Sequence, residues 1–329
     1  MKDKTRKIVI GSTVVAAGIA GAAVVSHAIT EYLMRLALHR QPPKSMVKTR
    51  EKMMGEKKNR ELVEKVRSAA ASLEERVTEI AEITAEDGTR LVGHWWPCEE
   101  PKRVLIAMHG WRSTWSQDFG MIADFWHDSG CSILFAEQRG QGKSGGDYMG
   151  FGLTERFDCL DWANWVNEKT DMLLPVYFGG VSMGAATILM ASGLPLPENV
   201  AGIVADCAFT SPYAIWKHVV KDNFHLSYDG IRGAAANELC KRKIKMGADS
   251  YSTTEALQNT DIPILFIHGS DDRFVPVEMT YENYKACASE KHLLIVSGAE
   301  HAMSYVVDKA AYENAILTFW DRYDKSVDL

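Results

Sequence analysis

From about residue 75 to the C-terminus, short apolar runs alternate with segments of helical periodicity, and this alternation restricts the possible folds more than any other feature. Six of these runs have the length and composition of strands that are buried on both faces. They are Val104–Met108, Ser132–Ala136, Val176–Gly179, Ala201–Ala205, Ile264–His268 and His292–Val296. Because helix-like segments separate the runs, we expect them to form a parallel sheet.

Two further strand-like runs precede these six. Val77–Thr84 and Arg90–Trp96 flank Glu86-Asp87-Gly88, which is a hairpin signal, so they should form a leading antiparallel pair. The sequence therefore predicts an α/β fold with a mostly parallel, eight-stranded sheet and helices on both of its faces.

One interval interrupts the alternation. Between Phe209 and Asp261 no strand-like run occurs, and the helix-like stretches 213–221 and 233–244 lie within it. Structureless loops of this length are uncommon in compact domains. We therefore predict a helical insertion, at about residues 209–261, that covers the carboxyl ends of the strands as a lid.

A serine lies at a strand-to-helix junction. Gly180-Val181-Ser182-Met183-Gly184 follows the run that ends at Gly179 and precedes a helix-like segment that begins at Ala185. A serine exposed on such a sharp turn needs small neighbours, which Gly180 and Gly184 supply. Its hydroxyl becomes a good nucleophile only when a base accepts its proton and a third group orients that base.

The chain supplies both groups in later loops. Asp271 and Asp272 follow the strand-like run that ends at His268, and His301 follows the run that ends at Val296. The chain order serine, aspartate, histidine is typical of one large class of hydrolases. These patterns alone leave both aspartates open as the orienting acid.

Residues from about 75 to 325 resemble the α/β-hydrolase superfamily, and specifically its bacterial esterase and serine-aminopeptidase-like branch, some members of which have an N-terminal membrane anchor. The resemblance rests on five motifs that occur in the family's order. They are His109-Gly110-Trp111, the segment from Gln138 to Ser144, the serine turn, the aspartate loop and the histidine loop. The resemblance implies an α/β-hydrolase fold.

The resemblance also implies roles for individual residues. Ser182 would be the nucleophile and His301 the base. The family's acid is separated from Val-Pro by two residues, which selects Asp272, although an exchange of roles with Asp271 remains an alternative. The backbone N–H groups of Trp111 and Met183 would form the oxyanion hole.

Several neighbouring motif residues would have structural roles. The resemblance implies a hydrogen-bonding role for His109 rather than a second catalytic base. It also implies that Arg139, Ser144, Glu155 and Asp158 stabilise loops. The chain departs from the family pattern at Gln138, where relatives have aspartate, and this departure puts a structural salt bridge in doubt.

We expect a carboxylic ester with an acyl or aromatic group as the small-molecule substrate, cleaved through an acyl-enzyme intermediate. The candidate pocket residues are all aromatic, with ordinary core or lid packing as their alternative role: Trp115, Phe151, Tyr213, Trp216 and Phe224. No acidic cluster stands out in the lid to hold the free amine of a peptide. A serine peptidase or aminopeptidase, a thioesterase and a non-catalytic binding module remain as alternatives.

The N-terminus is predicted to be a separate unit, residues 1–30. Residues 8–29 form an uncharged, mostly apolar run that follows four basic residues and is long enough to span a bilayer. Only Ser26-His27-Ala28 resembles a signal-peptide cleavage site, so we expect an uncleaved transmembrane helix. The basic residues on its two sides favour a single-pass protein of the cell membrane with an extracytoplasmic catalytic domain.

Residues 31–74 are predicted to form a basic helical connector, followed by a catalytic domain over residues 75–329. From Arg35 to Arg67 there are eleven Lys or Arg and four Glu, which suit either a segment attracted to anionic lipid or a solvated charged helix.

The net charge of the whole chain, −6, argues against a nucleic-acid partner. The six cysteines are widely spaced, so we expect neither a metal nor a disulfide framework, and we expect no cofactor.

Overall fold

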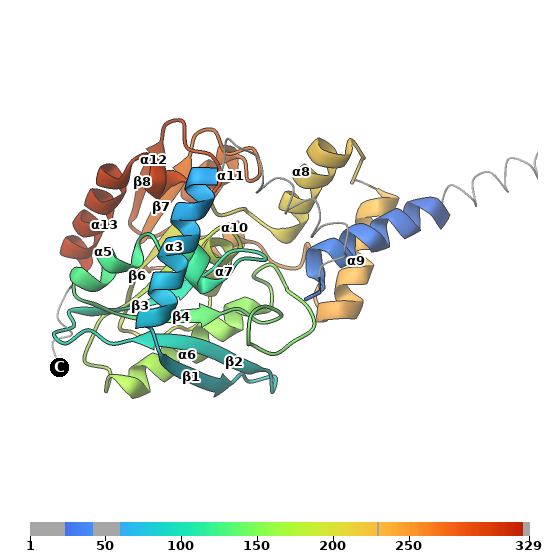
Figure 1. Cartoon of the computed structure of the whole chain (residues 1–329). Helices are drawn as coiled ribbons and strands as arrows, with labels where there is room; N and C mark the ends of the chain where they lie inside the picture. Colours follow the sequence, from blue (N-terminus) through green and yellow to red (C-terminus); the bar gives the residue numbers. More distant parts are fainter. Residues whose placement is uncertain (1–23, 42–59, 229, 325–329) are drawn as a thin grey trace, which may run out of the picture.

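The computed structural model describes residues 24–41, 60–228 and 230–324, with the side chains of residues 223 and 224 left out, and these residues are called the described part of the chain (Figure 1). A single eight-stranded sheet lies at its centre. Its strands are β1 (Glu79–Thr84), β2 (Arg90–Trp96), β3 (Arg103–Met108), β4 (Cys131–Glu137), β5 (Val176–Val181), β6 (Val200–Asp206), β7 (Ile264–Gly269) and β8 (Lys291–Val296).

The order of strands in the sheet is β1-β2-β4-β3-β5-β6-β7-β8. β1 and β2 form an antiparallel hairpin, β2 pairs antiparallel with β4, and all later pairs are parallel. The predicted mostly parallel, eight-stranded α/β sheet is therefore confirmed. Because the carboxyl ends of β5, β6, β7 and β8 lie at one edge, the loops that follow these strands meet there.

Helices lie on both faces of the sheet and beyond its edge. They are α3 (Arg60–Arg76), α4 (Trp115–Phe119), α5 (Ala123–Asp128), α6 (Glu155–Lys169), α7 (Met183–Ala191), α8 (Pro212–Phe224), α9 (Ile231–Ile244), α10 (Thr253–Leu257), α11 (Val277–Ala286), α12 (Ser304–Val307) and α13 (Lys309–Tyr323). A further helix covers residues 24–38.

Alternate residues of the central strands pack against different helices. In β3, Ile106 belongs to the core cluster that contains Trp162 of α6 and Ile188 of α7. Leu105, its neighbour, belongs to the cluster on the opposite face, with Phe319 of α13. This alternation follows from the two-residue period of a strand, and it explains why runs buried on both faces are almost wholly apolar.

The predicted lid interval contains α8 and α9, which lie beside the main body (Figure 1). Apolar side chains of both helices belong to a third cluster, the lid cluster, which also includes Met183, the residue after Ser182. The helix over residues 24–38 is part of the same assembly. Its Met34 and Leu38 are buried in the third cluster, and Arg232 of α9 hydrogen-bonds Ser26 across 3.4 Å.

The N-terminal transmembrane helix predicted for residues 8–29 needs correction. Within the described part of the chain, no helix is long and apolar enough to cross a membrane. The helix over residues 24–38 contains Glu31 and Arg35, and its Met34 and Leu38 pack against protein, whereas Val24 and Val25 within the predicted span are exposed. Residues 8–23 lie outside the described part, and the predictions of a membrane span and a single-pass membrane location are not supported.

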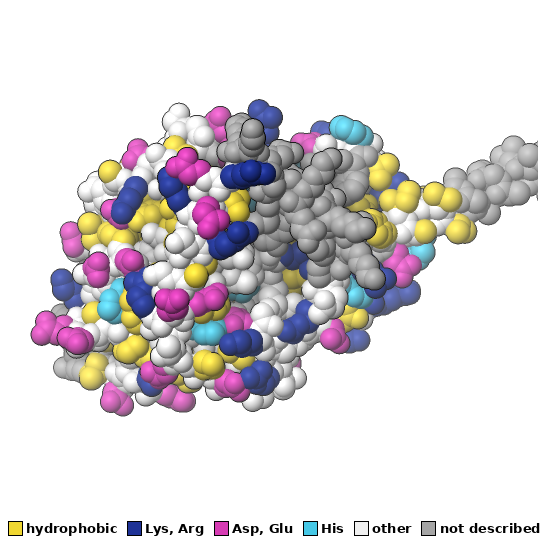
Figure 2. Space-filling model, in the orientation of Figure 1, with side chains coloured by type: hydrophobic (Ala, Val, Ile, Leu, Met, Phe, Trp, Pro, Cys, Tyr) yellow, Lys and Arg dark blue, Asp and Glu magenta, His cyan; other side chains and the backbone are white. Residues whose placement is uncertain are grey.

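The connector predicted for residues 31–74 also contacts the main body where it is described. Leu73 of α3 is buried in the core beneath the sheet, and the Ser116 hydroxyl of α4 donates to Glu74 across 2.5 Å. Acidic and basic side chains are interspersed over the visible face of this region (Figure 2). Residues 42–59 of the predicted connector lie outside the described part of the chain.

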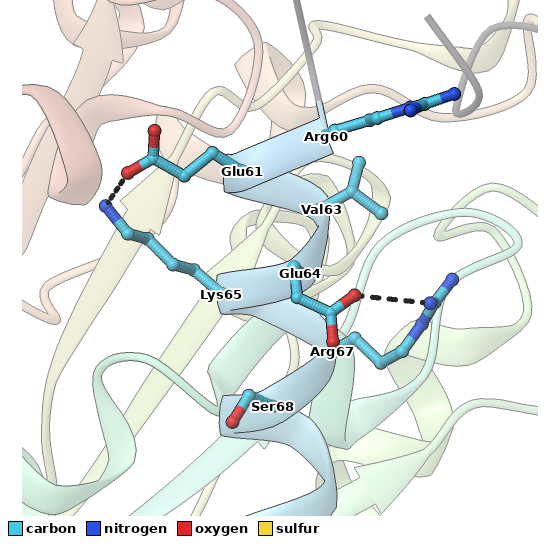
Figure 3. A pocket seen from close by; sticks show the side chains of 7 residues that line it. All are labelled: Arg60, Glu61, Val63, Glu64, Lys65, Arg67 and Ser68. Carbon is cyan, nitrogen blue, oxygen red and sulfur yellow. Dashed lines mark hydrogen bonds and ion pairs between the residues drawn. The ribbon is translucent and has the colours of Figure 1, made fainter. Parts of the chain in front are cut away.

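A shallow surface hollow of about 710 Å³ lies along the outer side of α3, and its lining residues are shown in Figure 3. Within it Lys65 pairs with Glu61 across 2.8 Å, and Arg67 pairs with Glu64 across 3.4 Å. Exposed ion pairs of this kind contribute little stability. Among its lining residues Ser68 is the one serine, and neither histidine nor aspartate occurs. The hollow therefore does not contain the serine, aspartate and histidine motifs.

Candidate active site

Ser182 lies in a strained turn between β5 and α7. Its backbone has φ 54°, a left-handed value that costs a non-glycine residue on the order of 1–3 kcal/mol. Its N–H donates to the Asp206 carbonyl across 2.9 Å, and its side chain makes no capping bond to α7. The hydroxyl is therefore directed away from the helix that it precedes.

The glycines on either side make this turn possible by their lack of a side chain. A Cβ atom on Gly180 would lie 2.7 Å from the backbone nitrogen of Ala185. A Cβ on Gly184 would lie 1.9 Å from the carbonyl oxygen of Met108, on the neighbouring strand. The two glycines let α7 start directly over β3 and β5, and so they fix where Ser182 stands.

The loops after β7 and β8 bring an imidazole and a carboxylate to this serine. The Ser182 hydroxyl lies 2.9 Å from Nε2 of His301. Nδ1 of the same ring lies 2.6 Å from Oδ2 of Asp272. In the tautomer that this carboxylate selects, Nδ1–H donates to Asp272, and Nε2 accepts from the serine hydroxyl.

Asp272 is fully buried and surrounded by donors. Its Oδ1 accepts from the backbone N–H groups of Phe274 and Val275, each across 2.9 Å. Burial alone would raise the pKa of Asp272, but hydrogen bonds from His268 and His301 outweigh burial and hold that pKa well below its usual range. The carboxylate therefore stays ionised and can orient a neutral or protonated imidazole.

Asp271, the alternative acid, faces elsewhere. Its side chain accepts from the Ser270 hydroxyl across 2.7 Å at an exposed position. Its backbone N–H donates to the Ala299 carbonyl across 3.0 Å, which joins the aspartate loop to the histidine loop. Of the two aspartates, Asp272 is the one in contact with His301.

His268 is a polar member of the site that the sequence analysis treated only as the end of a strand. It is fully buried, and its Nε2 lies 3.2 Å from Oδ2 of Asp272 and 2.9 Å from the Val275 carbonyl. Its Nδ1 lies 2.7 Å from the Thr280 hydroxyl. His268 thus supports Asp272 from behind. The available signal was a histidine at the end of an apolar run, four residues before Asp272.

Asp206, at the end of β6, is a second residue that the sequence analysis did not single out. Its carboxyl group accepts from the Ser304 hydroxyl across 3.3 Å and from the Tyr312 hydroxyl across 3.2 Å. It also lines a cavity of about 220 Å³ beside the loop of His301. Burial raises the pKa of Asp206 to about 6, although His268 and Tyr312 lower it. Asp206 links the serine turn to the histidine loop.

This pKa predicts the pH dependence of stability. A free aspartate titrates near 3.9, so the folded chain binds the Asp206 proton more tightly than the unfolded chain does. The contribution of Asp206 to stability is therefore greatest below about pH 4, falls as the pH rises to about 6, and is constant above that value. Relative to Asp206→Asn, the wild-type free energy of unfolding should decline across this window in urea titrations. A rising or flat difference would contradict the assignment.

The loop after β3 lies against Ser182. A Cβ on Gly110 would be 3.5 Å from Cβ of Ser182, and the Gly110 N–H donates to Asp118 across 2.6 Å. Trp111 follows Gly110 directly, and Met183 follows Ser182. Both predicted oxyanion donors thus belong to segments that adjoin the serine.

His109 is buried beneath this loop. Its Nε2 accepts from the Gln138 backbone N–H across 3.2 Å, and its Nδ1 donates to the Gly110 carbonyl across 2.9 Å. Burial lowers the pKa of His109, which suits a neutral ring. The Gln138 side chain donates to the His109 carbonyl and accepts from Thr187, so an amide makes the contacts at the position where relatives have aspartate.

The remaining motif residues hold loops in place. Arg139 donates to Asp158 across 2.8 Å and to Asp87 across 2.6 Å. Glu155 accepts from two backbone N–H groups, at 2.6 and 3.0 Å. The Ser144 hydroxyl donates to the Glu137 carbonyl across 2.5 Å.

The aromatic residues predicted for the pocket are only partly brought together. Phe151, Trp216 and Tyr213 belong to the lid cluster with Met183, and the ring centroids of Phe151 and Trp216 are 5.1 Å apart. Trp115 lies elsewhere, in the core cluster on the sheet face that packs against α13, and it stacks on His94 at 4.3 Å. Phe224 ends α8, and its side chain lies outside the described part of the chain.

Among the described residues, one group offers three metal-ligating side chains close together. Cys207, Asp272 and His301 have ligand atoms within 4.8 Å of one another. Two of the three are already hydrogen-bonded to each other across 2.6 Å. This group of three therefore overlaps with the serine, histidine and aspartate cluster, because Asp272 and His301 belong to both.

Comparisons with known proteins agree with this geometry. Residues 117–326, more than half of the chain, match the model of the prolyl oligopeptidase family, Peptidase S9. The chain belongs to the prolyl oligopeptidase family. This family member is 27% identical to the protein YqkD of Bacillus subtilis over 201 residues, which are 61% of this chain and 66% of YqkD. It is 25% identical to YfhR of Escherichia coli K12 over 231 residues, 68% of this chain and 73% of YfhR.

Solved structures show the same fold at low sequence identity. The esterase Pf2001 of Pyrococcus furiosus superposes with a TM-score of 0.62 and 20% identity, covering 75% of this chain and 91% of the esterase. Est1E of Butyrivibrio proteoclasticus, solved with bound ferulic acid, gives 0.57 and 16% identity, covering 74% and 98%. Family and fold together identify a serine hydrolase of the α/β-hydrolase type. The membrane-anchored branch is not shown by these matches.

Proposed function

We propose that this protein hydrolyses carboxylic esters with an acyl or aromatic acid group, through an acyl-enzyme on Ser182. The observation that supports this proposal most directly is the unbroken chain of hydrogen bonds from the Ser182 hydroxyl through His301 to Asp272. Such a chain lets the imidazole accept the serine proton while the buried carboxylate stabilises the imidazolium that forms.

In the proposed reaction, Oγ of Ser182 attacks the ester carbonyl carbon while His301 takes the hydroxyl proton. The oxygen of the tetrahedral intermediate becomes negatively charged and accepts from the N–H groups of Trp111 and Met183. His301 then gives its proton to the leaving alkoxide, and the C–O bond breaks to leave the acyl-enzyme. Water, deprotonated by His301, attacks the acyl carbon. His301 then returns this proton to Oγ of Ser182 as the bond between Oγ and the acyl carbon breaks, which releases the acid and free Ser182.

The surroundings of Ser182 favour an acyl or aromatic substrate group. The described side chains of the lid cluster are apolar or aromatic, and this cluster includes Met183, Phe209 and Met279. Glu155 and Asp249 are close enough to influence Cys240 of this cluster, and Glu155 accepts from two backbone N–H groups. The apolar and aromatic side chains of the cluster therefore support an acyl or aromatic group as the part of the substrate that binds there.

A peptide substrate is the second candidate, and the match to the prolyl oligopeptidase family favours it. The same Ser182, His301 and Asp272 would cleave an amide, with His301 protonating the leaving amine. A thioester would require no further catalytic group.

Matched substrates separate these candidates. We would compare p-nitrophenyl esters of acetate, butyrate, octanoate and ferulate with glycyl-prolyl and alanyl p-nitroanilides and with an octanoyl thioester. We expect kcat/KM to be highest for an ester of the longer or aromatic acids. Faster turnover of either anilide would refute the ester proposal, because anilides are intrinsically less reactive than these esters. Faster turnover of the thioester would replace it.

A further inference from the structure

The carboxyl end of the helix over residues 24–38 is bound by the loop that follows β3. Nη2 of Arg112 donates to the Leu36 carbonyl across 2.8 Å and to the His39 carbonyl across 2.5 Å. Nη1 of Arg112 donates to the Arg40 carbonyl across 3.2 Å. Nε1 of Trp111 donates to the Ala37 carbonyl across 2.9 Å.

These contacts meet a general need of helices. The last four carbonyl groups of a helix have no partner within the helix, and cations are favoured beside them. Here the missing donors come from Trp111 and Arg112, about seventy residues away along the chain. The planar guanidinium of Arg112 reaches several carbonyls at once, which a lysine ammonium group does less well.

The same loop is held from its other side. The Gly110 N–H donates to Asp118, and the Arg112 N–H donates to Oε1 of Gln141, both across 2.6 Å. Arg112 has φ 53°, a left-handed conformation that persists only when surrounding contacts impose it. Between these contacts lies the backbone N–H of Trp111, whose direction depends on how firmly both sides are fixed.

The helix itself is anchored independently of this loop. Leu38 is fully buried, and its carbonyl accepts from the Met149 N–H across 2.7 Å. The Arg40 guanidinium donates to the Ser144 carbonyl across 2.5 Å, and the Arg40 N–H donates to the Asp147 carbonyl across 2.8 Å. The docked helix is therefore a fixed point to which Arg112 can tie the loop.

We propose that Arg112 is a positioning residue of the oxyanion hole, which ties the loop of Trp111 to the carboxyl end of the helix over residues 24–38. This inference rests on the proposed function. In this arrangement Arg112 touches no reacting atom. It keeps the Trp111 N–H aimed at the developing oxyanion by tying this loop to backbone carbonyls at the end of the helix.

The test uses Arg112→Ala, Arg112→Lys and the control Arg40→Ala in the full chain. Arg40→Ala removes side-chain contacts from the same helix end to the loop of residues 142–146, but none to the loop of Trp111. We would measure kcat and KM for the best p-nitrophenyl ester, the thermal midpoint, and the affinity for a trifluoromethyl ketone with the same acyl chain. This ketone forms a hemiketal with serine, and its oxyanion reports directly on the hole.

We expect Arg112→Ala to lower kcat and ketone affinity together, by roughly 10- to 100-fold, with KM changed less than about threefold. Arg112→Lys should recover part of the loss. Arg40→Ala should keep kcat within about threefold of wild type even where its thermal midpoint falls.

Two results would overturn the inference. One is wild-type kcat and ketone affinity in Arg112→Ala. The other is an equal loss of both in Arg40→Ala, which would make the effect one of helix docking in general. If Arg112→Ala does not fold, Trp111→Phe removes the bond to Ala37 and keeps an aromatic ring toward Phe151 and Arg112. This variant should lower ketone affinity at least threefold, and unchanged affinity would count against the inference. Failure of the proposed function would instead appear as a wild-type protein without ester turnover.

Discussion

Replacing His301 by alanine is expected to lower kcat for the best ester substrate by about 10⁴- to 10⁶-fold, with KM nearly unchanged. The physical reason is the contact between Nε2 and the Ser182 hydroxyl at 2.9 Å. Without the imidazole, no group hydrogen-bonded to this hydroxyl accepts its proton, and the leaving alkoxide has no proton donor. Discontinuous assays, with the concentration of active enzyme determined by active-site titration, would measure the loss of kcat.

A matched histidine provides the control for this prediction. His127 of α5 stacks on Trp96 at 4.0 Å, and its Nε2 lies 3.0 Å from the Pro97 carbonyl, away from the serine turn and the aspartate loop. His127→Ala should keep kcat within about twofold. If His301→Ala retained more than about a tenth of wild-type kcat, another group would be the base, and the assignment of His301 would fail.

Replacing Asp272 by asparagine should lower kcat by about 10⁴-fold while the fold is preserved. The carboxylate selects the His301 tautomer with the proton on Nδ1, and it stabilises the imidazolium formed when the serine proton is accepted. An amide in its place loses the negative charge and can present a donor to that nitrogen. The pre-steady-state rate of acylation, together with the thermal midpoint, would separate this effect from unfolding.

Asp271→Asn is the control, because it changes the neighbouring residue by the same chemistry. Asp271 contacts Ser270 and the Ala299 carbonyl rather than His301. We expect its variant to keep kcat within about threefold. If the losses in the two variants were exchanged, Asp271 would be the orienting acid, which is the alternative that the sequence left open.

Much of the central architecture was predictable, because it depends on short stretches of sequence. Runs such as Ile264–His268 have the apolar composition that burial on both faces requires, and the structure confirms β7 there, ending one residue later. The hairpin of β1 and β2 followed from Glu86-Asp87-Gly88 between two alternating runs. These features are local, so neither needed knowledge of distant contacts.

The residues that were missed or misplaced depend on contacts between distant segments. Asp206 ends β6 and His268 lies one residue before the end of β7, and their polar roles become evident only when the loops after β7 and β8 are seen beside them. Trp115 follows the oxyanion loop closely in sequence, but α4 turns its ring into the core beneath the sheet. Spacing along the chain could not reveal that turn.

The N-terminal segment shows a different difficulty. An apolar run is compatible both with lipid and with burial against protein, since hydrophobicity alone does not distinguish the two environments. Only residues 24–29 of the predicted span are described, and the same helix buries Met34 and Leu38, which lie beyond the span, in the lid cluster. The partners that bury Met34 and Leu38 lie far along the sequence, in the lid helices α8 and α9.

Labelling by a fluorophosphonate probe tests the central claim most directly, because the probe forms a covalent bond only with an activated serine. We expect the wild-type protein to take up one probe per chain, on the peptide that contains Ser182, and Ser182→Ala to take up none. A wild-type protein that does not label, or a Ser182→Ala variant that labels as strongly as wild type, would contradict the account.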